Sequence, residues 1–227
     1  GGVIGCSIAY QLAKLGMTDV MLLERQELTS GSSWHAAGGV HGLHDTNNIA
    51  RLQYYTMNLY RELEAETGQS VGFHQTGYLY LAQSDERAHQ LRISAAKARQ
   101  FQGVEFHEIS LKEAAEKHPF VNFDGIQMAV WESESGHVDV NGVTHAYAQA
   151  ARNRGVTIER FCPVLETNQR PDGSWDVVTE KGTIHTRVLV NAAGLWGREV
   201  ARLAGLELPL MPMEHQYFVT EEVPEVA

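Results

Sequence analysis

Apolar residues recur every three or four positions in several stretches of the chain, the spacing that gathers them on one face of an α-helix. Helices are predicted over residues 8–15, 48–67, 85–102, 141–154 and between Ser110 and Pro119. Shorter apolar or alternating runs predict strands over 20–23, 71–81 (a pair bent at Gly77), 104–107, 126–131, 156–161, 175–179, 184–186 and 188–190. Helices and strands that alternate in this way indicate an α/β fold.

The order of these elements predicts a discontinuous domain arrangement. A glycine turn, a helix and a strand at the start are typical of a doubly wound nucleotide-binding domain, which we expect over 1–70 and 140–205. The region 71–139 is richer in strands and is expected to form an antiparallel substrate domain that resumes over 206–227. The second domain would therefore interrupt the first.

Composition excludes several classes of protein. The chain has 28 acidic and 18 basic residues and a formal charge of −10, which excludes the basic face of a nucleic-acid binder. Hydrophobic residues make up 43% of the chain, as in folded proteins, and every apolar run is shorter than the roughly 20 residues that cross a bilayer. Cys6 and Cys162 form no repeated motif, so neither disulfides nor structural zinc is predicted and a reducing compartment is favoured.

We expect the chain to be truncated at both ends. It begins at a glycine turn without methionine and without the hydrophobic strand that normally precedes such a turn. Its last residues stop in a turn-like stretch with no helix or cap. A targeting signal therefore cannot be judged from this sequence.

Two glycines point to a dinucleotide. Gly2 and Gly5 match the last two glycines of the dinucleotide fingerprint, in which the backbone approaches a pyrophosphate at a helix N-terminus. Glu24 follows the next strand about 20 residues on, where a carboxylate can bind ribose hydroxyls. The alternative is a glycine-rich start to a helix, followed by a solvated pair of Glu24 and Arg25.

A loop of small residues over 28–39 carries one histidine, His35, which by position alone could be a proton carrier, a metal ligand or a covalent attachment point. Further on, His41, His44 and Asp45 could each bind a metal. A zinc site usually needs a fourth ligand, so no metal site is predicted. The chain also lacks the Gly-x-Ser-x-Gly and His-Glu-x-x-His motifs of serine hydrolases and zincins.

Several segments together resemble the dimethylglycine and sarcosine dehydrogenase family, within the wider D-amino-acid-oxidase-like group of FAD enzymes. They are Gly2 with Gly5, Leu23-Glu24-Arg25, 30–38 (Ser-Gly-Ser-Ser-Trp-His-Ala-Ala-Gly), Glu66-Thr67-Gly68, 190–196 (Val-Asn-Ala-Ala-Gly-Leu-Trp) and 214–217 (Glu-His-Gln-Tyr). They occur in the family's order and cover essentially the whole chain. The resemblance implies a Rossmann-like FAD-binding domain with an interleaved antiparallel-β substrate domain.

The resemblance also implies roles for individual residues. His35 would be linked covalently to the 8α-methyl group of FAD, and His215 would accept the proton of the substrate amine or hold it by a hydrogen bond. Ordinary hydrogen-bonded histidines are the alternative for both. The other cofactor contacts would be Gly2, Gly5, Glu24, Arg25, Gly31, Ser32, Ser33, Ala36, Ala37, Gly38, Val164, Ala193, Gly194 and Trp196.

The function that the resemblance implies is FAD-dependent oxidation of a CH–NH group, with demethylation of a small N-methylated amino acid by hydride transfer to flavin N5. Tetrahydrofolate would bind only through a later domain absent from this chain, and the electron acceptor stays open. The expected location is the bacterial cytoplasm or the mitochondrial matrix. Two alternatives are a regulatory subunit like that of pyruvate dehydrogenase phosphatase, which the presence of His35 argues against, and a nicotinamide-dependent dehydrogenase.

Overall fold

A computed structural model describes residues 1–44, 46–102 and 106–224 of the chain. The chain divides into two compact units, Gly1–Pro163 and the part from Val164 onward. Each unit contains both helices and strands, and the first combines parallel with antiparallel pairing. The expected α/β class is therefore confirmed, while the discontinuous domain boundaries stay a prediction.

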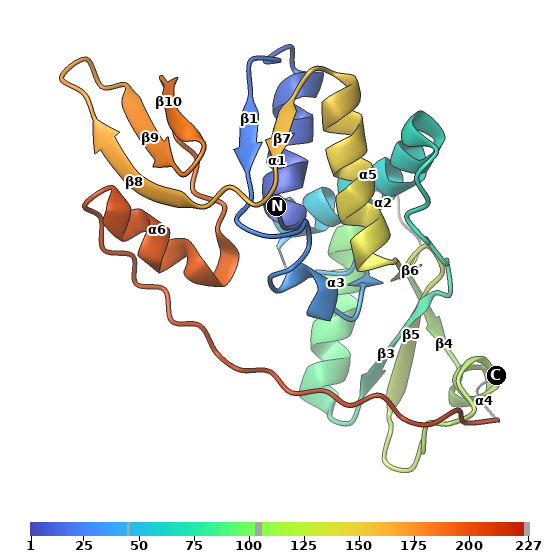
Figure 1. The fold of residues 1–227 in the computed structure, drawn as a ribbon. Coiled ribbons are helices and arrows are strands. Elements are labelled where there is room, and N and C mark those ends of the chain that lie inside the picture. Colours follow the sequence, from blue (N-terminus) through green and yellow to red (C-terminus); the bar gives the residue numbers. More distant parts are fainter. Residues whose placement is uncertain (45, 103–105, 225–227) are drawn as a thin grey trace. The chain divides into compact units, whose positions relative to one another are not determined.

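The first unit begins with a nucleotide-binding type of arrangement (Figure 1). Its parts are α1 (Val3–Lys14), β1 (Met21–Leu23), α5 (Val140–Asn153) and β7 (Thr157–Glu159), with β1 parallel to β7. Small residues allow α1 and α5 to pack closely, because Ala9, Ala13, Ala146 and Ala150 are buried between larger neighbours such as Tyr10. The helix predicted at 141–154 is confirmed to within one residue at each end, and the helix predicted at 8–15 is confirmed but begins five residues earlier, at Val3.

A long helix and a short ladder follow this layer. Helix α2 (Asn47–Thr67) ends at Gly68, whose φ of +70° is the left-handed conformation that glycine adopts without strain. Strand β2 (Gly39–Val40) pairs antiparallel with β6 (Gly136–His137). This ladder ties the loop after α1 and β1 to the chain just before α5.

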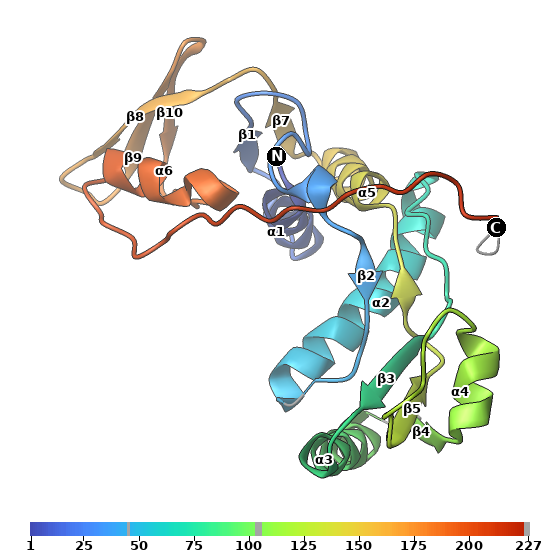
Figure 2. The ribbon, with the colours of Figure 1, turned by 90° about the horizontal axis from the view of Figure 1, so that it is seen from below.

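The rest of the first unit is an antiparallel sheet in the order β3-β5-β4, with α3 and α4 on opposite sides of it (Figure 2). Its elements are β3 (Tyr78–Ala82), α3 (Asp85–Gln102), β4 (Phe106–Ile109), α4 (Leu111–Lys117) and β5 (Met128–Glu132). Ser110 caps α4 by accepting a hydrogen bond from the Glu113 amide at 3.1 Å, as the sequence predicts.

The second unit is a three-stranded antiparallel meander followed by short helices. It contains β8 (Val164–Gln169), β9 (Trp175–Thr179), β10 (Gly182–Thr186), the 3-10 turn η2 (Gly194–Trp196) and α6 (Gly197–Leu203). Val177 of β9 and Ala201 of α6 are among its buried side chains. Residues 206–223 form no helix or strand.

Two strand predictions need correction, and one strand was missed. Over 71–81 only β3 is a strand, and the preceding part contributes one isolated bridge, His74 to His137. No strand forms over 188–190, where Val188 and Val190 are exposed, because a strand needs a hydrogen-bonded neighbour and the described chain provides none there. Strand β8 was not predicted, since its polar residues give no apolar alternation. Of the strand expected over 104–107, residues 104 and 105 lie outside the described residues.

Candidate functional site

The turn before α1 leaves little room for a side chain, because the side chains of Glu24 and Ser33 lie close to its two glycines. A Cβ atom on Gly1 would lie 2.7 Å from Cγ of Glu24, and one on Gly2 would lie 3.0 Å from Oγ of Ser33. Gly2 is the N-cap of α1, so no side chain covers the helix start at this position, and the first turn contains no acidic residue. The helix N-terminus therefore offers backbone amides and a positive dipole end at the surface of the turn.

Neighbouring loops hold this turn in place. Ser33 Oγ accepts a hydrogen bond from the Val3 amide at 2.9 Å, and the Thr29 amide donates to the Gly1 carbonyl at 3.0 Å. Thr29 adopts a φ of +70°, an uncommon conformation for a residue other than glycine. Sequence reasoning missed Thr29, because a positive φ at threonine leaves no mark in the residue pattern.

Glu24 lies beside the turn, directly after β1. Its Oε2 is 2.8 Å from the Gly1 nitrogen, and its Oε1 accepts a hydrogen bond from the Gln26 amide at 2.8 Å. The side chain keeps 16% of its surface exposed. The thiol of Cys6 also contacts this turn, donating a hydrogen bond to the Gly1 carbonyl. Burial raises the pKa of the thiol to about 11, so it stays protonated and remains a donor.

His35 lies on the exposed part of the loop that closes this turn. The loop forms the short 3-10 turn η1 (Ser33–His35), and the rings of Trp34 and His35 have centroids 3.7 Å apart. The other end of the loop is fixed at Gly38, whose carbonyl accepts a hydrogen bond from the Val138 amide at 2.9 Å. Between these anchors the exposed residues are Trp34, His35, Ala36 and Ala37.

The remaining predicted residues lie in the second unit. Val164 begins β8, and 193–196 form a turn in which Asn191 accepts from the Ala193 amide at 3.1 Å and donates to the Gly197 carbonyl at 2.8 Å. Trp196 is the N-cap of α6. His215 is exposed within the stretch 206–223. The structure thus brings Gly2, Glu24 and Ser33 together at one turn, whereas the predicted residues from Val164 onward lie in the other unit.

A family comparison covers the entire chain. The model of the family DAO, FAD dependent oxidoreductase, matches residues 1–227. The chain belongs to this family. It is 43% identical to rat (Rattus norvegicus) mitochondrial dimethylglycine dehydrogenase and 37% identical to human (Homo sapiens) mitochondrial sarcosine dehydrogenase, over 100% and 98% of its own length. It spans only 26% and 25% of those relatives, about a quarter of each.

A solved structure supports the same assignment of the DAO fold. L-proline dehydrogenase from P. horikoshii superposes with a TM-score of 0.83 and 28% sequence identity. The match covers 91% of this chain and 54% of that protein. The family resemblance inferred from the sequence is therefore confirmed.

The glycine turn suits the dinucleotide of a DAO-family protein. Glycines stand at the start of α1, Ser33 Oγ occupies the Val3 amide, the Glu24 carboxylate lies beside the turn, and the loop of His35 leaves its small residues exposed. Phosphates bind at such helix starts because the amides have no intrahelical partner. The metal alternative gains no support: the described residues contain no group of three His, Cys, Asp or Glu side chains placed to hold a metal, and Asp45 lies outside them.

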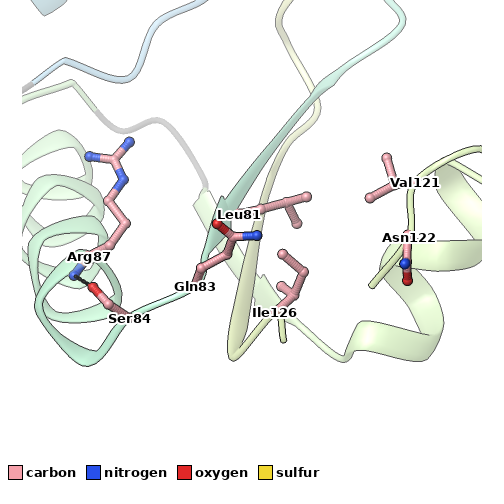
Figure 3. A pocket seen from close by; sticks show the side chains of 7 residues that line it. All are labelled: Leu81, Gln83, Ser84, Arg87, Val121, Asn122 and Ile126. Atoms are coloured by element: carbon pink, nitrogen blue, oxygen red, sulfur yellow. Dashed lines mark hydrogen bonds between the residues drawn. The ribbon is translucent and has the colours of Figure 1, made fainter. Parts of the chain in front are cut away.

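A cavity elsewhere in this DAO-family chain is separate from the candidate site. It measures about 600 Å³, is open to solvent and contains none of the predicted site residues (Figure 3). It is lined by Leu81, Gln83, Ser84, Arg87, Val121, Asn122 and Ile126. Among the helices that the structure describes, none is long and apolar enough to cross a membrane.

Proposed function

We propose that this chain is the FAD-binding segment of an amine oxidoreductase that demethylates a small N-methylated amino acid of the dimethylglycine or sarcosine type. The observation that carries the proposal is one loop that both closes the glycine turn, through Ser33, and exposes His35. The relatives that are 43% and 37% identical support the substrate class by their names. The mitochondrial names also favour a matrix location over the bacterial cytoplasm.

The turn would hold the adenosine diphosphate half of FAD. Gly2 and Gly5 allow the pyrophosphate to approach the amides at the start of α1, where the dipole favours negative charge. Glu24 Oε2 would accept hydrogen bonds from ribose hydroxyls, and the exposed Arg25 would lie toward the adenine side.

His35 would hold the other half of the cofactor. A ring nitrogen of His35 would be bonded to the 8α carbon, and the adjacent Trp34 ring, tilted by 36° to the imidazole, would limit the orientations of the imidazole. The bond keeps the cofactor in place, and an electron-withdrawing imidazolyl group favours reduction of the ring. When bound, FAD would supply the hydride acceptor that amine oxidation requires.

His215 would act on the substrate amine. A hydride leaves the N-methyl carbon only when the nitrogen carries a lone pair, because that lone pair stabilises the iminium. An imidazole can take the amine proton or hold the amine by a hydrogen bond. Replacing it by alanine should lower kcat/KM for the methylated amino acid by about a hundredfold.

Acid precipitation of the full-length protein tests the proposal. We expect flavin absorbance to stay in the washed pellet of the wild type and to leave it in His35→Ala. The matched control is His89→Ala, which changes an exposed histidine of α3 and should keep the colour in the pellet. Colour in the wild-type supernatant would refute the covalent bond, and absence of colour would favour the regulatory or nicotinamide alternatives. Reduction of an artificial acceptor by dimethylglycine or sarcosine, and not by glycine, tests the substrate class.

A further inference from the structure

A carboxylate is completely buried at the end of β5. Glu132 has no exposed surface, and its two oxygens accept hydrogen bonds from three donors. Oε1 accepts from the Gly42 amide and from the Tyr54 hydroxyl, both at 2.9 Å, and Oε2 accepts from the Tyr80 hydroxyl at 2.8 Å. We call these four residues the Glu132 cluster.

The members of the Glu132 cluster come from four places in the first unit. Glu132 ends β5, Tyr80 lies in the neighbouring strand β3, Tyr54 lies in α2, and Gly42 follows β2. Burial, and then the negative charge of Glu132, raises the pKa of both tyrosines, so their hydroxyls stay donors well above neutral pH. A buried charge is costly unless hydrogen bonds compensate it. This geometry satisfies the carboxylate with neutral donors.

The Glu132 cluster holds residues 42 and 43, which follow the loop of His35. A Cβ atom on Gly42 would lie 2.1 Å from Cζ of Tyr54, so the backbone packs directly against this ring. The Gly42 amide also lies 3.3 Å from Ser135 Oγ, and Ser135 precedes β6. The adjacent Leu43 is buried in the core with Tyr54. Residues 42 and 43 are therefore held by hydrogen bonds and by packing.

The same contacts set the position of the β2-β6 ladder. Gly39 and Val40 pair with His137 and Gly136, and the segment that begins at Glu132 leads into β6. The Gly38 carbonyl, one residue before β2, accepts from the Val138 amide at 2.9 Å. A single segment, 132–138, thus binds the chain at Gly38, along β2 and at Gly42. His35 lies three residues before the first of these anchors.

We propose that Glu132 is a positioning residue that fixes Gly38 to Gly42 and so places the loop of His35 for attachment of the flavin. This inference rests on the proposed function. Attachment would form a bond between an imidazole nitrogen of His35 and the 8α carbon, with loss of one proton from each; the two electrons would reduce the flavin ring, and dissolved dioxygen would reoxidise it. The imidazole must therefore stay close to the 8α carbon, because small displacements of a reacting group slow a reaction strongly. Glu132 acts through the backbone and does not touch the reacting atoms.

The test measures how fast the full-length apoprotein binds added FAD in acid-stable form. Glu132→Ala leaves two hydroxyls without their acceptor and the Gly42 amide with only its longer bond to Ser135, and it should slow attachment roughly tenfold or more. Glu132→Gln keeps an oxygen for Gly42 and Tyr54 and turns its amide toward Tyr80, so it should restore most of the rate. The matched control Glu134→Gln alters an exposed carboxylate two residues away and should leave the rate unchanged.

Two further measurements separate positioning from general stability. Val177→Ala shortens a buried side chain of β9 in the second unit and should lower the free energy of unfolding without slowing attachment. Hydrogen exchange should accelerate over 38–43 in Glu132→Ala and in the milder Tyr80→Phe, with α1 and α5 unchanged. Attachment at the wild-type rate in Glu132→Ala, or equal slowing in Val177→Ala, would overturn the inference. If the wild type binds no acid-stable flavin, the proposed function fails. In that case hydrogen exchange alone tests the fixing role, and exchange over 38–43 that is unchanged in Glu132→Ala would overturn that role as well.

Discussion

The glycine turn at α1 and the Glu132 cluster lie in the same unit and are built in opposite ways. The turn consists of residues without side chains and leaves backbone amides accessible. The cluster consists of a carboxylate, two tyrosines and the Gly42 amide, whose buried polar atoms bond to one another. The first therefore suits binding of a ligand from outside, whereas the second suits fixing the chain from inside.

This difference predicts where substitutions act. In the turn, an added side chain should weaken cofactor binding and change the free energy of unfolding little, since few contacts are lost. In the cluster, each lost partner leaves a buried polar group unsatisfied, which lowers the free energy of unfolding. The predictions below run from the largest expected effect to the smallest.

Gly42→Ala should have the largest effect on stability. Its Cβ would overlap the ring of Tyr54, and we expect the free energy of unfolding to fall by about 3 kcal/mol, as measured by urea denaturation. Gly197→Ala is the control, because a Cβ there would meet nothing closer than 3.8 Å. Equal stability of the two variants would show that the Tyr54 ring does not constrain residue 42.

Tyr54→Phe and Tyr55→Phe form a matched pair on α2. The Tyr54 hydroxyl is buried on Glu132, and its loss should lower the free energy of unfolding by about 2 kcal/mol. Tyr55 is 49% exposed, and its hydroxyl bonds to Gln11, so its replacement should cost less than about 0.5 kcal/mol. Urea midpoints that fall equally in the two variants would contradict the role of the cluster.

Gly2→Val should act on cofactor binding instead. The new side chain would displace Ser33 Oγ from the Val3 amide, and the affinity of the full-length apoprotein carrying His35→Ala for FAD should fall roughly tenfold. Titration of tryptophan fluorescence with FAD measures this affinity. The graded control is Gly2→Ala, with a smaller loss. A loss of stability with unchanged affinity would place the phosphates elsewhere.

The smallest effect concerns Cys6 and appears only at alkaline pH. Because burial raises the pKa of its thiol in the folded state from 9.0 to about 11, the stabilisation is complete below pH 9 and is lost as pH rises toward 11. Relative to Cys6→Ala, the wild type should lose about 1 kcal/mol of unfolding free energy per pH unit in this window. A constant difference between the two proteins from pH 8 to pH 11 would contradict the burial of the thiol.

The helices could be predicted closely from the sequence, because local periodicity and caps determine them. The expected helix over 85–102 coincides with α3, and the expected cap at Ser110 forms. Strands were predicted less well, since a strand depends on its partner: β8 pairs with β9 despite polar residues, whereas 188–190 is apolar but has no partner in the described chain.

Part of the candidate site could be anticipated from motifs, whereas its buried side chains could not. Gly2 and Glu24 were expected near one nucleotide and Ser33 near the flavin; the structure places all three at one turn, and their roles in cofactor binding stay predictions. The Glu132 cluster was missed, although a signal existed: Met128 and Val130 face inward, and period-two alternation continues to Glu132. In a sequence, an acidic residue at an inward position is ordinarily taken as the end of a strand, which is why the alternation did not mark Glu132 as buried. Only the three-dimensional pairing of distant tyrosines reveals its partners.

Mass spectrometry of one peptide tests the central claim most directly. Trypsin should release residues 26–51 from the denatured full-length protein, because cleavage follows Arg25 and Arg51. The account predicts that this peptide carries the mass of FAD less two hydrogens, and that fragmentation places the added mass on His35. An unmodified peptide, or an added mass on His41 or His44, would contradict it.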